Sequence, residues 1–366
     1  MRITGVEAFP IALPFREPYI AANGTIERRE MVVLRITGDG GAAGHGDAVP
    51  MSLRGGPGLE RVTRELDGAC AAALMGAELG STEDVARIVA SCAAGGVSTS
   101  ALCAVDTGLL DLLGRASGTP VWRLLGADRA GPVPCNGTLG GGEPGVVAAT
   151  ARKLAADGFR TLKVKVGTGE DVERLRAVRD AVGPDVALRV DANGSWCLSR
   201  AQRELRELDR DVGLELAEQP CESLEELSGL RASVPVPIVA DESVATSADA
   251  ERAVALDACD AVTLKLAKVG GPHAALAVAE RIPSYLSSAL DSAIGVAAGL
   301  HTALALPAGG FAAGLAHGLA TSSLFADDVT PSHGLGGPAP DPGSSPGLGI
   351  DVDPAALRRL AIRLDP

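Results

Sequence analysis

The sequence contains few aromatic residues. Phe, Trp and Tyr together make up 2% of the 366 residues, although 46% of the chain is hydrophobic. The interior must therefore be built mainly from Ala, Val and Leu, and the 46 glycines allow backbone segments to approach one another closely. Charged residues make up 22% of the chain, which is typical of globular proteins, so we expect it to fold rather than remain disordered.

Positive charge is also in deficit. The chain carries 33 Lys and Arg residues against 46 Asp and Glu residues, and its formal net charge is −13. Binding to phosphate groups requires clustered basic side chains. Nucleic acids and anionic membrane surfaces are therefore not expected as partners.

Long hydrophobic runs and a secretion signal are absent as well. The longest apolar tract, residues 293–308, is interrupted by His301 and Thr302 and is shorter than the roughly 20 residues that cross a bilayer. The first 15 residues lack a basic region followed by an apolar stretch. The seven cysteines include no C-x-x-C pair, so neither a disulfide framework nor a zinc site is indicated. We expect a cytoplasmic protein with reduced thiols.

Lysine is scarce among the basic residues. Only five of the 33 are Lys, and four of these five lie in two short apolar segments, TLKVKV at 161–166 and VTLKLAK at 262–268. A lysine, unlike an arginine, can lose its proton when its surroundings shift its pKa. The lysines of these segments are therefore candidates for proton transfer. The alternative is a structural role, in which these lysines only end the strands and place their charged amines in water.

From about residue 130 the chain repeats a short apolar strand, a polar turn and an amphipathic helix. Successive strands end, in steps of 28, 27, 23 and 24 residues, at Lys163, Asp191, Glu218, Asp241 and Lys265. The same step extends the series to strands near 134–136, 285–288 and 311–315, which makes eight. Eight such units predict an α/β fold whose parallel strands close into a TIM-type barrel, with the active site at their carboxyl ends. An open doubly wound sheet is the alternative.

The barrel is predicted at residues 129–328, between two other parts of the chain. Residues 1–128 predict an α+β capping domain. Its expected elements are strands at 3–14 and 31–36 and helices near 58–75, 82–93 and 98–116. Residues 329–366 begin as a Pro- and Gly-rich segment and end in a short helix at 353–363 that returns to the capping domain. The prediction is thus a modified TIM barrel covered by a capping domain.

Three carboxylates are predicted at the same end of neighbouring strands. Asp191, Glu218 and Asp241 each come directly after an apolar strand. Three carboxylates that converge without a counter-ion would repel one another strongly. Oxygen ligands alone favour a hard divalent cation such as Mg²⁺. The sequence therefore predicts a Mg²⁺ site at the mouth of the barrel.

Two lysines are predicted on opposite sides of this site, Lys165 on the second strand and Lys265 on the sixth. A lysine acts as a general base near neutral pH only if its pKa falls from about 10.4 towards 7 or 8. Lys163 lies on the same face of the strand as Lys165, and both this neighbour and the metal are expected to lower the pKa of Lys165. The chemistry indicated is abstraction of a proton next to a carboxylate, with the metal stabilising the enediolate.

Five segments carry a resemblance to a known family. They are, in chain order, LKVKVG, RVDANGSW, LAEQP, ADES and VTLKLAKVGG. As an ordered set they resemble the strand-end motifs of the enolase superfamily, in its muconate lactonizing enzyme subgroup, and the similarity extends over nearly the whole chain. The resemblance implies Mg²⁺ on the three carboxylates, acid/base roles for Lys165 and Lys265, tuning of Lys165 by Lys163, and Asn193 beside the metal. It also implies a small-molecule carboxylate substrate and a homo-oligomer.

Members of this subgroup share their catalytic groups and differ in their substrates. They include o-succinylbenzoate synthases, N-succinylamino acid racemases, dipeptide epimerases and muconate cycloisomerases. The segment that begins at Ser287 and Ser288 is similar to the corresponding segment of o-succinylbenzoate synthases. This favours a synthase-like dehydratase or an N-acylamino acid racemase whose pocket includes these serines. Tyr19 and Arg54 of the capping domain are candidates to contact the substrate as well.

Several alternatives stay open. A dipeptide epimerase would hold the peptide ammonium with an Asp-x-Asp motif, for which the chain offers only the adjacent Asp327 and Asp328. Asp47 stands where the family commonly has Glu. Racemisation would use both lysines and elimination needs only one as a base, so the lysines do not decide between these reactions. The alternative of a different class is a non-catalytic binding protein on the same fold. Such a protein would be expected to lose at least one of the three carboxylates and two lysines of the predicted site.

Overall fold

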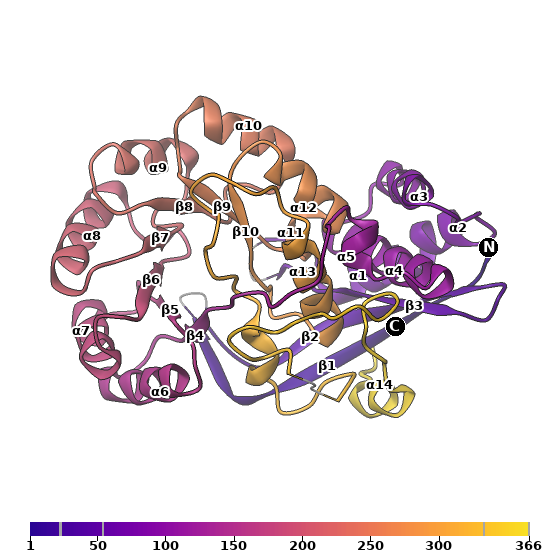
Figure 1. Ribbon diagram of the computed structural model, residues 1–366, viewed down its shortest axis with the longest axis horizontal. Helices are drawn as coiled ribbons and strands as arrows, with labels where there is room; N and C mark the ends of the chain where they lie inside the picture. The colour runs from indigo at the N-terminus through magenta and orange to yellow at the C-terminus, as the bar shows by residue number, and fades with distance from the viewer. Residues whose placement is uncertain (22–23, 53–54, 332–333, 365–366) are drawn as a thin grey trace.

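The N-terminal part of the chain begins with a three-stranded antiparallel sheet (Figure 1). The computed structural model describes residues 1–21, 24–52, 55–331 and 334–364. The strands, in sheet order, are β1 (Ile3–Ala21), β2 (Gly24–Gly38) and β3 (Ala43–Ala48). β1 and β2 extend further than predicted, because the polar arm of this hairpin lacks the apolar alternation that marks a strand in sequence.

Helices cover this sheet, and the three predicted helical regions are found. They are α1 (Leu59–Glu65), which continues through a π-helical turn (Leu66–Cys70) into α2 (Ala71–Leu74), then α3 (Thr82–Ala94), α4 (Thr99–Ser117) and the short α5 (Val121–Leu124). α4 lies close against β3 because Gly44 and Gly46 have no side chains. A Cβ atom at Gly46 would lie 2.0 Å from the carbonyl oxygen of Ala104.

The second part is a parallel sheet of seven strands that curls around on itself, with helices outside it (Figure 1). The sheet order is β10-β9-β8-β7-β6-β5-β4, so consecutive strands are neighbours. The strands are β4 (Gly137–Leu139), β5 (Thr161–Lys165), β6 (Ala187–Asp191), β7 (Leu216–Glu218), β8 (Ile238–Ala240), β9 (Ala261–Leu264) and β10 (Ser284–Leu286). This arrangement confirms the predicted α/β fold with a capping sheet and contradicts an open doubly wound order, in which the strand sequence would reverse.

The eighth strand position is filled by residues other than those predicted. Residues 311–315 do not form a strand. Instead His317 forms a parallel bridge with Cys135 beside β4, and Gly318 forms one with Ser287 beside β10. The first strand is likewise shifted from 134–136 to β4. Only glycine fits at position 318 without a shift of its neighbours, because a Cβ atom there would lie 2.4 Å from the Ser287 hydroxyl oxygen.

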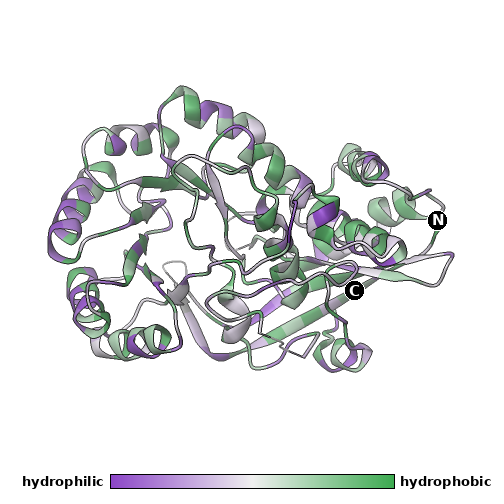
Figure 2. Ribbon diagram, viewed as in Figure 1, coloured by the Kyte–Doolittle hydropathy of each residue, from purple (hydrophilic) through white to green (hydrophobic). Residues whose placement is uncertain are grey.

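The connecting helices shield the sheet from solvent. They are α6 (Pro144–Ala156), α7 (Asp171–Val182), α8 (Leu198–Val212), α9 (Leu224–Arg231), α10 (Ser247–Ala255), α11 (Leu266–Val269), α12 (Pro272–Ala279) and α13 (Ala293–Leu304). Figure 2 shows that the outer helix α8 is largely hydrophilic, whereas α13 is hydrophobic. α13 is buried from Ala293 to Thr302, between the barrel and the capping domain.

The C-terminal segment returns to the capping domain. After a 3-10 turn (Ala320–Leu324) the chain reaches α14 (Pro354–Leu360), which packs against β1. Ile362 donates its backbone N–H to the carbonyl oxygen of Pro10. No helix within the described ranges is both long enough and apolar enough to cross a membrane.

Candidate active site

The three predicted carboxylates lie at one edge of the parallel sheet. Asp191 is the last residue of β6, Glu218 is the last residue of β7, and Asp241 directly follows β8. Asp191 and Glu218 are direct neighbours in the β6–β7 register. All three are 0% exposed. Such burial of charge requires compensation by opposite charge.

Buried lysines supply that compensation. Lys163 Nζ lies 3.0 Å from Glu218 Oε1 and 3.1 Å from Asp191 Oδ2. Lys165 Nζ lies 2.6 Å from the same Asp191 oxygen, and Lys265 pairs with Asp241. These ion pairs form two groups, one around Asp191 and Glu218 and one around Asp241. The charges of Lys265 and Asp241 also act on Asp191, so the two groups belong to one charge cluster.

Lys268 also belongs to this cluster; the sequence analysis counted it among four candidate lysines but did not place it in the site. Its Nζ lies 2.9 Å from Asp241 Oδ1 and donates to the carbonyl oxygen of Thr263 at 3.0 Å. The side chain comes from the first turn after β9, in α11, which returns it to the strand end. Its position three residues after Lys265 was the available signal, because residues i and i+3 of a helix lie on one side.

The pKa values differ in direction from the sequence-based expectation. Burial lowers the pKa of Lys165, but Asp191 and Tyr19 raise it more, and the net pKa lies above the usual value. Lys163 does lower the pKa of Lys165, as expected, without changing that balance. Burial raises the pKa of Asp191, but Lys165 and Lys163 lower it more, so this group stays ionised. The neighbouring carboxylates thus favour the protonated form of Lys163 and Lys165.

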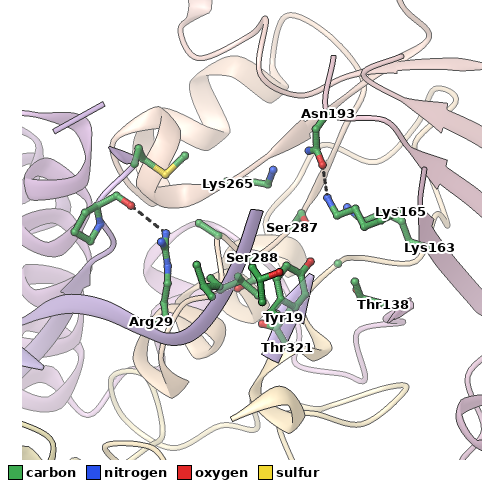
Figure 3. A pocket seen from close by; sticks show the side chains of 17 residues that line it. Tyr19, Arg29, Thr138, Lys163, Lys165, Asn193, Lys265, Ser287, Ser288 and Thr321 are labelled. Atoms are coloured by element: carbon green, nitrogen blue, oxygen red, sulfur yellow. Dashed lines mark hydrogen bonds between the residues drawn. The ribbon is translucent and has the colours of Figure 1, made fainter. Parts of the chain in front are cut away.

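A cavity of about 150 Å³ opens between the strand ends and the capping sheet (Figure 3). All described residues that we predicted to contact substrate line it, namely Tyr19, Asn193, Ser287 and Ser288. Lys163, Lys165 and Lys265 line it too. The remaining candidate, Arg54, lies outside the described residues.

Hydrogen bonds position two of these lining residues. Asn193 Oδ1 accepts from Lys165 Nζ at 2.8 Å, while Asn193 Nδ2 donates to Glu242 Oε1 at 3.0 Å. Asn193 thereby holds the amine of Lys165 in place (Figure 3). Ser288 donates its hydroxyl to Asp291 Oδ2 at 2.7 Å, so this serine is committed to a structural contact.

Other lining residues were not assigned from the sequence. Arg29 of β2 projects from the capping sheet, Thr138 lies within β4, and Thr321 lies in the 3-10 turn. The Thr321 hydroxyl is buried and has no hydrogen-bond partner among the residues that the structure describes. No sequence signal marks these residues, because each reaches the cavity only through the way distant segments pack.

Asp327 and Asp328, the candidates for an ammonium site, do not line this cavity. Asp327 pairs with Arg359 at 2.8 Å, and Asp328 accepts the backbone N–H of Ala293 at the start of α13. His317 also has a structural contact, since its ring accepts the backbone N–H of Leu286 at 3.0 Å. These residues stabilise the fold around the site.

Asp47, where the family commonly has Glu, links the capping domain to the barrel. Its carboxylate accepts from the backbone N–H and the hydroxyl of Ser292, at 3.0 and 2.7 Å. Burial, and then the nearby Asp291, raise the pKa of Asp47 from 3.8 to about 7, and Asp328 contributes further. This proton therefore belongs to an interface between two parts of the fold.

Replacing Asp47 with Asn is expected to reduce the pH dependence of stability. The unfolded chain releases the Asp47 proton near pH 3.8 and the folded protein holds it to about pH 7. The folded state binds more protons in this window, so the free energy of unfolding falls as pH rises through it. Urea denaturation between pH 4.5 and 8 would measure this slope, with exposed Asp39→Asn as the control. An unchanged slope in Asp47→Asn would assign the proton elsewhere.

Comparison with known proteins places the chain in a family. The model of the mandelate racemase / muconate lactonizing enzyme N-terminal domain matches residues 3–126, and the enolase C-terminal domain-like model matches residues 146–356. The chain belongs to the enolase superfamily, in its muconate lactonizing enzyme subgroup. The resemblance seen in the five motifs is confirmed.

Individual relatives in this superfamily have different activities. N-succinyl-L-Arg/Lys racemase of Bacillus cereus is 27% identical over 100% of this chain and 99% of its own length. The crystal structure of that racemase superimposes with a TM-score of 0.91 at 26% identity and covers 99% of both chains. o-Succinylbenzoate synthase of Mycolicibacterium smegmatis is 43% identical over 54% of this chain and 61% of its own length. A dipeptide epimerase structure from Enterococcus faecalis, complexed with Mg and L-Leu-L-Tyr, gives a TM-score of 0.87 at 29% identity. The match covers 96% of this chain and 99% of the epimerase chain.

The superfamily match settles the class of activity. The protein is an enzyme of the enolase superfamily, whose members abstract a proton next to a carboxylate in Mg-dependent reactions. A non-catalytic binding protein is therefore not supported. The relatives are racemases, epimerases and synthases, so the family leaves the individual reaction to be decided by the cavity.

The donor set of the site can be compared with the needs of Mg²⁺. Within the described residues, no group of three or more His, Cys, Asp or Glu side chains is gathered as a metal cage. Lysine ammonium groups are paired with the three predicted ligands instead. The chemistry nevertheless fits, because three fully buried carboxylates at adjacent strand ends offer only oxygen, the ligand that Mg²⁺ prefers.

Proposed function

We propose that this enzyme removes the proton next to a carboxylate of an acidic, succinyl-bearing substrate. It acts either as an o-succinylbenzoate synthase-like dehydratase or as an N-acylamino acid racemase. The observation that carries the proposal is the placement of two buried lysines in one cavity. Lys165 ends β5 and Lys265 follows β9, with three strands between them. A substrate bound between them presents one face of its acidic carbon to each amine.

In this proposal Asp191, Glu218 and Asp241 hold Mg²⁺. The bound ion supplies positive charge that stabilises the enediolate. Neutralisation of these carboxylates would remove the negative charge that raises the pKa of Lys163 and Lys165. Burial already opposes the charged form of both lysines, so the neutral amine is favoured. Lys165 can then accept the proton, and Lys265 can donate one or act as a cation on the other face.

The residues around the lysines position the substrate. Asn193 restrains the amine of Lys165, and the Ser287 side chain contributes to the opposite wall. Tyr19 is proposed to contact the bound molecule from the capping domain, and Arg54, the other candidate for substrate contact, lies outside the described residues. Dipeptide epimerisation and muconate cycloisomerisation remain the alternatives within the same chemistry. The cavity gives the first of these less support, because Asp327 and Asp328 are engaged elsewhere.

A substrate panel in deuterated water tests this proposal. We expect exchange or turnover with the o-succinylbenzoate precursor or with N-succinylamino acids, and much weaker reaction with Ala-Glu type dipeptides and cis,cis-muconate. Mass spectrometry detects deuterium at the acidic carbon, and chiral chromatography separates racemisation from elimination. A sample treated with a chelator is the control. Efficient turnover of dipeptides or muconate, with none of the succinyl compounds, would contradict the assignment while leaving the proton chemistry intact.

A further inference from the structure

The cavity has an uneven distribution of charge. Among the described residues that line it there are four cationic side chains and no carboxylate. Lys163, Lys165 and Lys265 lie at the barrel end, where Asp191, Glu218 and Asp241 face them. Arg29 lies at the other end, on the capping sheet, and is set apart from the lysines (Figure 3). The two ends therefore offer positive charge to two separate groups of one ligand.

Arg29 is held in position by the capping domain itself. The residue pairs with Leu13 in the β1–β2 ladder, and its Nη2 donates to the carbonyl oxygen of Pro50 at 3.0 Å. Pro50 comes shortly after β3 and lines the cavity together with Met51, so this bond ties the guanidinium to the cavity wall. Asp291 lies near enough for the charge of Arg29 to lower its pKa, and its carboxylate also accepts from Ser288 and from the backbone N–H of Ala289.

We propose that Arg29 determines substrate specificity by binding a second carboxylate of the substrate, remote from the carbon that loses its proton. This inference rests on the proposed function and names the group that the succinyl chain presents. The planar guanidinium suits a carboxylate, with which it can form two parallel hydrogen bonds. A peptide ammonium at the same place would meet a cation, with no carboxylate on the described walls to balance it. Arg29 thereby selects dianionic over zwitterionic substrates.

The test compares Arg29→Gln with Arg28→Gln on matched substrates. Arg28 is the neighbouring residue on β2, its side chain is 64% exposed, and it does not line the cavity. We expect Arg29→Gln to lower kcat/KM for an N-succinylamino acid by about 10- to 100-fold, chiefly through KM, because it loses a charge-assisted pair. The N-acetyl derivative of the same amino acid should change little, and Arg28→Gln should behave as wild type on both. Arg29→Lys should restore part of the difference.

The outcomes separate this inference from the proposed function. An equal loss on both substrates would make Arg29 a structural residue and overturn the inference, as would no loss on either. If wild type turns over no succinyl compound, the proposed function fails. In that case, calorimetric titration with succinate and with acetate, in the presence of Mg²⁺, tests separately whether Arg29 binds a second carboxylate. Tighter binding of succinate that disappears in Arg29→Gln supports it, and equal binding by the two proteins contradicts it.

Discussion

Replacing Lys165 or Lys265 with alanine is expected to lower turnover by about 10²- to 10⁴-fold, the range supplied by a positioned general acid or base. Both amines are buried beside the carboxylate cluster and line the cavity. The measurement is kcat on the substrate that the panel identifies, with circular dichroism as the test of folding. Lys153→Ala is the matched control, since Lys153 is exposed on α6.

Arginine substitutions refine this prediction. Arginine keeps the positive charge but does not release its proton, so it can replace a lysine that acts only as a cation. If the reaction is racemisation, Lys165→Arg and Lys265→Arg should both be as impaired as the alanine variants. If it is elimination, one arginine variant should retain more activity than the corresponding alanine variant. Near-normal rates in either alanine variant would show that the lysine only solvates the strand tip.

Asp191→Asn, Glu218→Gln and Asp241→Asn are each expected to weaken Mg²⁺ binding by at least about 100-fold. Residues that only support a metal ligand already cost 10- to 100-fold in affinity when replaced, so loss of a ligand should cost about that much or more. Isothermal titration with Mg²⁺ measures the affinity directly. Asp185→Asn is the control, because Asp185 is exposed at the opposite end of β6. If all three variants bound Mg²⁺ with wild-type affinity, the assignment of these carboxylates as metal ligands would be wrong.

The same variants should also lose stability when no metal is added. Asp191 pairs with both Lys163 and Lys165, and removing its charge leaves two buried ammonium groups less compensated. Breaking a buried ion pair in this way costs about 3–5 kcal/mol. Urea denaturation in the presence of a chelator measures this loss. If the Asp191→Asn protein is stable without metal, then the two ammonium groups lose their protons easily, as a general base requires.

The lysines and carboxylates could be predicted from the sequence because parallel strands bring their carboxyl ends to one edge. A polar residue after each apolar strand, repeated at intervals near 25 residues, therefore specified both the barrel and the members of the cluster. The same reasoning could not find Arg29, since its place over the cavity depends on how the capping sheet packs against the barrel. It also misplaced the eighth strand, because residues 317 and 318 are held by single bridges and carry no strand-like run of apolar residues.

The pKa directions of the lysines could not be predicted from the sequence for a different reason. Sequence spacing shows which charged groups share an edge, but the sign of the shift depends on distances of a few ångströms. Burial lowers the pKa of Lys163, but its Nζ lies 3.0 Å from Glu218 Oε1, and attraction to Glu218 and Asp191 outweighs the effect of burial. The chemistry of the site thus depends on what neutralises its carboxylates.

The uneven use of lysine has a practical consequence for labelling this protein. All five lysines lie in the described part of the chain, and the four in the two strand-end segments are between 4% and 7% exposed, whereas Lys153 is exposed on α6. A lysine-directed acylating reagent should therefore modify Lys153 rapidly and the other four side chains slowly. Peptide mapping of the acylated protein would then report, without any substrate, how often the mouth of the barrel opens. Attachment to a surface through Lys153 would leave the catalytic face unmodified.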